Sequence, residues 1–206
     1  MALVTVPALI KARFVEDAKI TPGFMDLEHR GLYAPTVRQV ASLPGGFEWV
    51  MECPFVSVTE EEGAELRAFL MKLRGRVNTF RFPVPGWTGL LSGYTGAAGL
   101  VKGAGQLGTS LESDGWNPSE LLLKEGDWFT VNDELKICAA DVSSDGLGEA
   151  AITFEPPLRR APADNAPFVI SSPYALMAQI SPAEPWSVKP SQQGRYMLRG
   201  RESLNG

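Results

Sequence analysis

The residues that could carry chemistry include a glycine motif, Gly103-Ala104-Gly105-Gln106-Leu107-Gly108. Its GxGxxG spacing is the pattern with which many enzymes bind dinucleotides. The pattern works only when a strand precedes it and a helix follows it, because the N-terminus of that helix holds the pyrophosphate. Here a glycine-rich tract precedes the motif, and residues 109–118 have no helical periodicity. We therefore interpret the motif as part of a glycine-rich arm and expect no bound cofactor.

A second motif, DVSSDG at residues 141–146, resembles the start of a calcium-binding loop. An EF-hand loop also needs a bidentate glutamate at its twelfth position, and here that position is Ile152. The flanking segments have the pattern of strands, whereas an EF-hand is flanked by helices. A hairpin turn built on Asp145 and Gly146 explains the motif better, so we expect no metal there.

The remaining reactive side chains form no recognisable catalytic set. His29 is the only histidine, so a Ser-His-Asp or Cys-His system would have to use it, yet no GxSxG motif is present. Cys53 and Cys138 are far apart and form no CxxC pair. We expect two reduced, partly buried thiols, with a disulfide as the alternative. The 24 acidic residues would allow a glycosidase pair, but nothing selects two of them. The sequence therefore predicts a protein that is not an enzyme.

A basic turn, Arg74-Gly75-Arg76, could bind a phosphate or a carboxylate. Arginines at the C-terminus of a helix more often complement the helix dipole and pair with a nearby acid. In an oligomer that acid can belong to the next subunit. We therefore name Arg74 and Arg76 as candidate subunit-interface residues, together with two aromatic anchors of the following segment, Trp87 and Tyr94.

The element that positions this turn is predicted to be a helix over about residues 59–74. Thr59 and Glu62 have the spacing of a capping box, and acids crowd the first turn, where the helix dipole favours them. Gly75 ends the helix. The apolar face has the spacing i, i+3, i+4 and i+7 and consists of Leu66, Phe69, Leu70 and Leu73.

Strands are predicted on both sides of the helix. Residues 47–53 alternate, which places Phe47, Trp49, Met51 and Cys53 on one face, and residues 77–82 alternate in the same way. From Pro83 the character changes, because glycines recur through residues 86–108 before strand patterns resume.

We predict a mainly β fold whose β-sandwich core comprises residues 1–83 and 151–206 and contains the helix. Residues 84–150 are predicted to form an inserted small β-barrel or hairpin subdomain that carries the glycine-rich arm. Both ends of this insertion are proline-rich, so we expect it to be separable from the core.

Composition limits the classes of partner. The chain has 206 residues, of which 44% are hydrophobic and 21% are charged, so it can form a packed core. Its net charge of -5 argues against general binding to nucleic acid. The apolar run at the N-terminus is too short for a signal peptide, and no segment reaches the roughly 18 apolar residues of a membrane helix. We expect folding in the cytoplasm and no membrane span.

Several of these segments occur together in a known pattern. It begins with Trp49, the helix and the strand after it, and continues through GDWFTVNDELKI at residues 126–137 and FEPPLRRAP at residues 154–162. It ends with Pro173-Tyr174-Ala175, Trp186 and Gly194-Arg195-Tyr196. Over most of residues 45–200 the chain resembles the distal tail proteins and related minor tail proteins of long-tailed (siphovirus-like) phages and prophages.

The resemblance implies a structural protein of the virion tail that is assembled in the host cytoplasm. It implies a β-sandwich subunit in a homohexameric ring, which joins the tail tube protein to the tail hub protein and the fibre-bearing baseplate. It implies no catalytic residue and no cofactor. In such a ring, Arg76→Glu is expected to weaken assembly, because the new acid would face an acid across the contact.

The alternative is a carbohydrate-binding module or cell-wall hydrolase associated with the tail. This alternative depends on three tryptophans around the insertion, Trp87, Trp116 and Trp128, because aromatic faces bind sugars. The same residues would equally serve core and interface packing.

Overall fold

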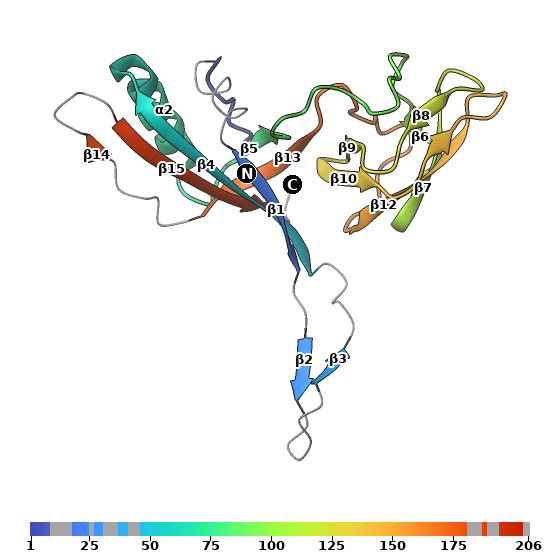
Figure 1. Cartoon of the computed structure of the whole chain (residues 1–206), viewed down its shortest axis with the longest axis horizontal. Helices are drawn as coiled ribbons and strands as arrows, with labels where there is room; N and C mark the ends of the chain where they lie inside the picture. Colours follow the sequence, from blue (N-terminus) through green and yellow to red (C-terminus); the bar gives the residue numbers. More distant parts are fainter. Residues whose placement is uncertain are drawn as a thin grey trace.

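The computed structural model describes residues 1–8, 18–24, 27–30, 37–40, 46–180, 187–188 and 194–203. These residues form a mainly β protein with helix α2 (Glu60–Leu73), and the strands make antiparallel sheets around two hydrophobic cores (Figure 1). The predicted mainly β class is confirmed, and so is the helix predicted over about residues 59–74.

One sheet, the core sheet, has six strands in the order β1-β4-β15-β13-β5, with β14 also paired to β15. It combines strands from the beginning and the end of the described chain. The polypeptide between β5 and β13 leaves this sheet and returns to it. The strands are β1 (Lys19–Phe24), β4 (Phe47–Val58), β5 (Thr79–Pro83), β13 (Tyr174–Gln179), β14 (Ser187–Val188) and β15 (Gly194–Glu202).

The chain between β5 and β13 forms a second sheet in the order β6-β7-β12-β10-β9, together with the two-stranded sheet of β8 and β11. We call this part of the chain the second unit. Figure 1 shows this unit beside the core sheet, curled around its own core. Its strands are β6 (Leu100–Val101), β7 (Gly108–Asp114), β8 (Leu121–Leu123), β9 (Trp128–Val131), β10 (Glu134–Cys138), β11 (Val142–Ser143) and β12 (Ala150–Leu158).

A hairpin of β2 (Leu27–Arg30) and β3 (Val37–Val40) lies apart from both sheets. In Figure 1 it projects beyond the ends of β1 and β4. Within the described residues these two strands pair with each other and with no other strand.

The core sheet has one buried face, as the alternation of β4 predicts. Trp49, Met51 and Cys53 are each at most 3% exposed, whereas Glu52 between them is exposed and pairs with Arg199 on the outer face. Helix α2 covers part of the buried face through its predicted apolar stripe. Each large apolar side chain buried in this way contributes about 1.5–3 kcal/mol to stability.

Strand β10 is shared by the two cores. Leu135 is buried in the core of the core sheet, whereas Cys138 belongs to the core of the second sheet. The indole Nε1 of Trp49 donates to the carbonyl oxygen of Leu135 at 3.0 Å, and the rings of Trp49 and Trp128 lie 5.2 Å apart. The second sheet thus covers the part of the core-sheet face that lies beyond α2.

The second unit extends past the predicted boundary at residue 150. That boundary falls at the first residue of β12, which pairs with β7 and β10. Residues 151–158 therefore lie in the second sheet and not in the core sheet to which the prediction assigned them. The chain returns to the core sheet near Pro173, whose carbonyl oxygen accepts the N–H of Val84 at 3.2 Å.

Residues 86–108, interpreted from their composition as a glycine-rich arm, are held against the second unit by hydrogen bonds and packing. The N–H of Leu91 donates to the buried carboxylate of Asp127 at 2.7 Å, and the Ser92 hydroxyl donates to the carbonyl oxygen of Leu122 at 2.7 Å. Tyr94 packs against the second core. Glycine at position 99 allows the backbone to lie close to the Trp116 ring, because a methyl group there would overlap the ring.

Candidate functional site

The two motifs with a possible ligand turn out to be loop structures. The GxGxxG motif follows β6, and its last glycine, Gly108, begins β7, so the motif leads into a strand and not a helix. The N–H of Gly103 donates to Asp164 at 2.8 Å. In the calcium-like segment, the Asp145 carboxylate accepts the N–H groups of Leu147 and Glu149, both at 2.8 Å. These bonds lower the pKa of Asp145. Its oxygens therefore stabilise the turn itself.

The thiols are separated and buried. Cys53 lies in the core of the core sheet and Cys138 in the second core, and both are free, as expected. Burial raises the pKa of Cys138, which keeps the thiol protonated and a weak nucleophile. Among the described residues, no cluster of three or more His, Cys, Asp or Glu side chains is arranged to hold a metal. His29 belongs to strand β2.

An open surface feature lies at the C-terminal end of α2. Arg74 caps the helix in the left-handed conformation, with φ of 50°, and Gly75 follows with φ of 66°. The side-chain amide of Asn78 donates to the carbonyl oxygen of Lys72 at 2.8 Å. The amide oxygen of Asn78 accepts the N–H of Ala2 at 3.1 Å. Asn78 therefore ties the helix end to the N-terminal segment.

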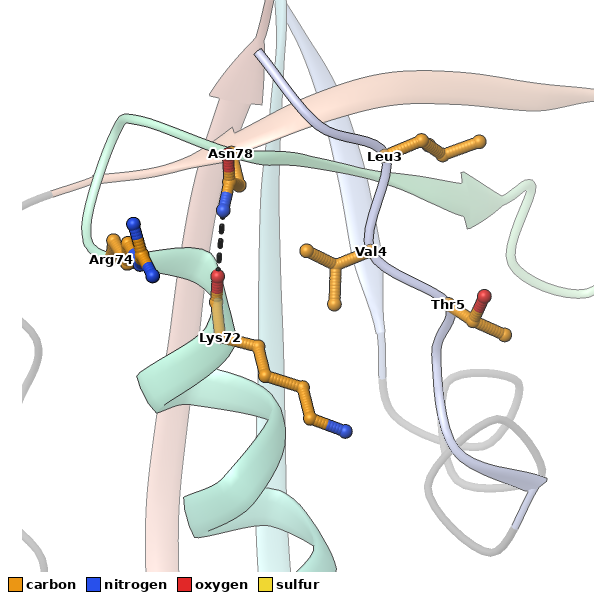
Figure 2. A pocket seen from close by; sticks show the side chains of 6 residues that line it. All are labelled: Leu3, Val4, Thr5, Lys72, Arg74 and Asn78. Carbon is orange, nitrogen blue, oxygen red and sulfur yellow. Dashed lines mark hydrogen bonds between the residues drawn. The ribbon is translucent and has the colours of Figure 1, made fainter.

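An open pocket of about 400 Å³ lies between the helix end and the N-terminal segment. The segment runs beside β5, where the N–H of Val4 donates to the carbonyl oxygen of Thr79 at 2.7 Å. Figure 2 shows the Val4 side chain pointing into the space between segment and helix, above the side chain of Lys72. The pocket is lined by Leu3, Val4, Thr5, Lys72, Arg74 and Asn78.

The charge of this pocket is positive. Lys72 and Arg74 line it, and Arg76 follows on the same turn; all three side chains are exposed. Within the described residues none of them forms an ion pair with an acid, whereas Arg67 on the same helix pairs with Glu60 at 3.2 Å. We define these three cations together with the pocket as the cationic end of α2.

The structure separates the four predicted interface residues. Arg74 and Arg76 lie at the end of α2. Trp87 and Tyr94 are half-buried and lie in the glycine-rich residues 86–108. The indole Nε1 of Trp87 donates to the carbonyl oxygen of Ser171 at 3.3 Å, and Trp87 packs on the core of the core sheet. The Tyr94 hydroxyl donates to the carbonyl oxygen of Ala97 at 2.8 Å. Both aromatic rings therefore have packing roles within their own chain.

A buried ionic cluster, which the sequence pattern did not predict, joins the two sheets. Lys136 Nζ lies 2.8 Å from Glu134 Oε2, with both side chains at most 4% exposed. Arg159 Nη2 lies 2.7 Å from Glu202 Oε1, and Glu202 also accepts the N–H of Trp49 at 3.2 Å. Burial lowers the pKa of Lys136 against the opposing effect of Glu134. The only sequence signal was charge inside the apolar alternation of β10.

Tyr174 takes part in a second contact between the two sheets. The Tyr174 hydroxyl donates to the Asp133 carboxylate, and the Arg81 guanidinium lies 4.5 Å from the centre of the Tyr174 ring. Burial raises the pKa of Tyr174, and the Asp133 carboxylate raises it further. Arg81 comes from β5, Tyr174 from β13 and Asp133 from the turn between β9 and β10. This contact therefore connects the core sheet to the second sheet.

Comparisons with known proteins leave the site to be judged on its geometry. No protein-family model matches the chain, and no curated protein matches it significantly. In the described part of the chain, no helix has both the length and the apolar character that crossing a membrane requires.

Proposed function

We propose that this chain is a structural subunit of a phage tail tip. In this role it closes a homo-oligomeric ring that joins the tail tube to the hub and the fibre-bearing baseplate. It is assembled in the host cytoplasm and remains in the virion tail. The role requires shape and contact surfaces, and it requires neither a catalytic residue nor a cofactor.

The observation that carries the proposal is the projecting hairpin of β2 and β3. A two-stranded hairpin is at best marginally stable in water, because it has little apolar surface to bury. Here the hairpin lies beyond the core sheet and pairs with no third described strand (Figure 1). A surface on another subunit would supply the missing contacts, as expected for a protein that works in an assembly.

The segments that resemble tail proteins support the same reading, because their residues have packing roles. Trp49 and Phe69 are buried in the core of the core sheet, and Phe154 is buried in the second core. Arg159, from the FEPPLRRAP segment, joins the two sheets through Glu202. The resemblance therefore rests on residues that determine the fold of a subunit.

The tryptophans that motivated a carbohydrate-binding alternative give it no support. Trp116 is 4% exposed and lies in the second core. Trp128 packs against Trp49, and the indole of Trp87 donates to Ser171. A sugar-binding platform needs an open aromatic face, and these three rings are engaged in packing. We therefore propose no second function.

The first test is the mass of the purified chain. We expect light scattering over a range of concentrations to show assembly from the 22.3 kDa subunit to a ring, with six copies expected. Electron microscopy should show rings, and antibody labelling should place the chain at the tip of purified tails. A monomer at every concentration, together with absence from tail tips, would overturn the proposal.

The Arg76→Glu variant then tests the cationic end of α2 as an interface. We expect it to assemble more weakly than the wild type while its circular dichroism is unchanged, because Arg76 is exposed and carries no core contact. Lys124→Glu makes the same charge change at an exposed position between β8 and β9 and should assemble normally. An intact ring with Arg76→Glu would remove this residue from the interface and leave the proposed function in place.

A further inference from the structure

The two ends of α2 carry opposite charges. The first turn contains Glu60, Glu61 and Glu62. Glu62 is used within the chain, because its carboxylate accepts the N–H of Thr59 in the capping box. Glu61 is exposed, and the Glu60 side chain, which pairs with Arg67 at 3.2 Å, is still 86% exposed. Two carboxylates therefore face solvent at the start of the helix, which we call the acidic end of α2.

The cationic end of α2 has what a carboxylate-bearing partner needs. Lys72 and Arg74 line an open pocket, and the amide of Asn78 in its wall is already bonded to the helix end. Arginine and lysine bind carboxylates through charge-assisted hydrogen bonds. Exposed apolar side chains also occur here: Leu3 in the pocket wall is 52% exposed, and Met71, next to Lys72 in the chain, is 78% exposed. The pocket thus offers cations for an acid and apolar surface beside them.

We propose that the cationic end of α2 receives the acidic end of α2 from a second copy of this chain. The inference rests on the proposed function and names the two surfaces that meet in the ring. A 14-residue helix is about 21 Å long, so one rigid element carries both halves of the contact at its opposite ends. Each copy donates one end and accepts the other, which is the head-to-tail arrangement that a cyclic ring requires.

Charge makes this pairing selective. The chain has a net charge of -5, so two copies repel each other on average. The three cations at the cationic end of α2 attract an acidic patch of another copy. Because the interacting groups are exposed, the attraction falls as salt rises. Assembly of the wild type should therefore weaken with increasing salt concentration.

The test uses two charge-reversal variants. Lys72→Glu/Arg74→Glu makes both ends of α2 acidic, and Glu60→Lys/Glu61→Lys makes both ends basic. Thr59 and Glu62 stay unchanged, so the capping box remains. Each variant alone should show an apparent dissociation constant for assembly raised at least about tenfold, because like charges then meet. An equimolar mixture should assemble again, with the two variants alternating around the ring.

The mixture also controls for folding, since only folded chains can restore assembly, and circular dichroism of each variant alone checks α2 directly. A control, Lys124→Glu with Glu125→Lys, reverses two exposed charges on the second unit, away from α2 (Figure 1), without changing the net charge, and should assemble like the wild type. If the wild type forms rings and both α2 variants do too, or if the mixture fails to assemble, the pairing of the ends is wrong and the proposed function is untouched. A wild type that never assembles would overturn both.

Discussion

Glu134 shows what a single buried charge does for this molecule. Its side chain is 4% exposed and lies 2.8 Å from Lys136 Nζ. It also accepts the backbone N–H groups of Arg159 and Arg160, both at 3.2 Å. A buried carboxylate is costly unless its oxygens are paired, and here they are paired by the strand β10 and by the chain just after β12. The carboxylate thus fixes where β12 ends.

We expect Glu134→Gln to lower the free energy of unfolding by about 3–5 kcal/mol, the usual cost of removing one partner from a buried ion pair. Lys136 would then stay buried without its counter-charge. Urea denaturation followed by fluorescence measures the change. Glu52→Gln, which breaks the half-exposed pair with Arg199, is the control and should cost less than about 1 kcal/mol. Equal effects of the two substitutions would contradict this account.

Tyr174 gives a prediction for alkaline pH. Its pKa is raised above the ordinary value of 10, so the folded protein keeps the phenol proton at pH values where the unfolded chain has lost it. The resulting stabilisation is complete below about pH 10 and is lost as pH rises through the folded pKa. Above pH 10 the free energy of unfolding should therefore fall more steeply in the wild type than in Tyr174→Phe.

Urea denaturation at a series of alkaline pH values measures the two slopes. Lys136 and Cys138 also have shifted pKa values, but both titrate in the wild type and in the variant. The difference between the slopes therefore isolates Tyr174. Parallel curves would show that the phenol does not contribute.

At the scale of elements, the features that were predicted from the spacing of nearby residues are present in the structure. The capping box is present, with the N–H of Glu62 donating to the Thr59 hydroxyl at 3.3 Å, and the alternation of β4 buries Trp49 and Met51 as predicted. Both patterns depend on residues a few positions apart. The place of β12 depends on pairing with β7 and β10, which are distant in the chain, and local pattern carries no information on that choice.

Gly99 tests the close packing of the glycine-rich segment. A methyl group there would overlap the indole of Trp116 and approach the carbonyl oxygen of Asp114. Trp116 is 4% exposed and cannot move without disturbing the second core. We expect Gly99→Ala to lower the free energy of unfolding by about 1–3 kcal/mol, the usual cost of overpacking.

Differential scanning calorimetry would measure this change, with Gly146→Ala as the control. Gly146 has open space where its methyl group would be placed and lies outside the left-handed region, so its substitution should leave the melting temperature nearly unchanged. A Gly99→Ala variant as stable as Gly146→Ala would show that the segment can shift to make room.

At the scale of the whole molecule, two deletions test where the second unit begins and ends. Replacing residues 86–171 by a Gly-Ser linker removes the second sheet entire, and the ends to be joined are close because Val84 bonds to Pro173. Replacing residues 84–150, the insertion predicted from sequence, leaves β12 without β7 and β10.

We expect the first deletion to unfold cooperatively, although less stably than the whole chain, because Trp49 loses its cover from Leu135 and Trp128. The second deletion should not fold cooperatively, since the buried residues of β12, such as Phe154, would be exposed. Circular dichroism during urea denaturation separates the two outcomes. Equal cooperativity would support the boundary at residue 150.

The candidate site was only partly readable from the sequence. The basic turn with Arg74 and Arg76 follows from its position after a helix, so it could be located. The pocket could not, because Leu3, Val4 and Thr5 form its other wall through a backbone contact with β5, and nothing in residues 1–8 marks that contact. The roles of Trp87 and Tyr94 were missed for a similar reason: their partners lie far along the chain.

Strand β10 has a mechanical consequence. Because it belongs to both cores, a twist applied to the second sheet reaches the core sheet through contacts along a whole strand. The two covalent crossings near Val84 and Pro173 lie side by side and would by themselves act as a swivel. Rotation about that point would have to uncover Leu135 and pull Arg159 from Glu202 at the same time. Rotation of one unit against the other is therefore opposed, and the two units move together.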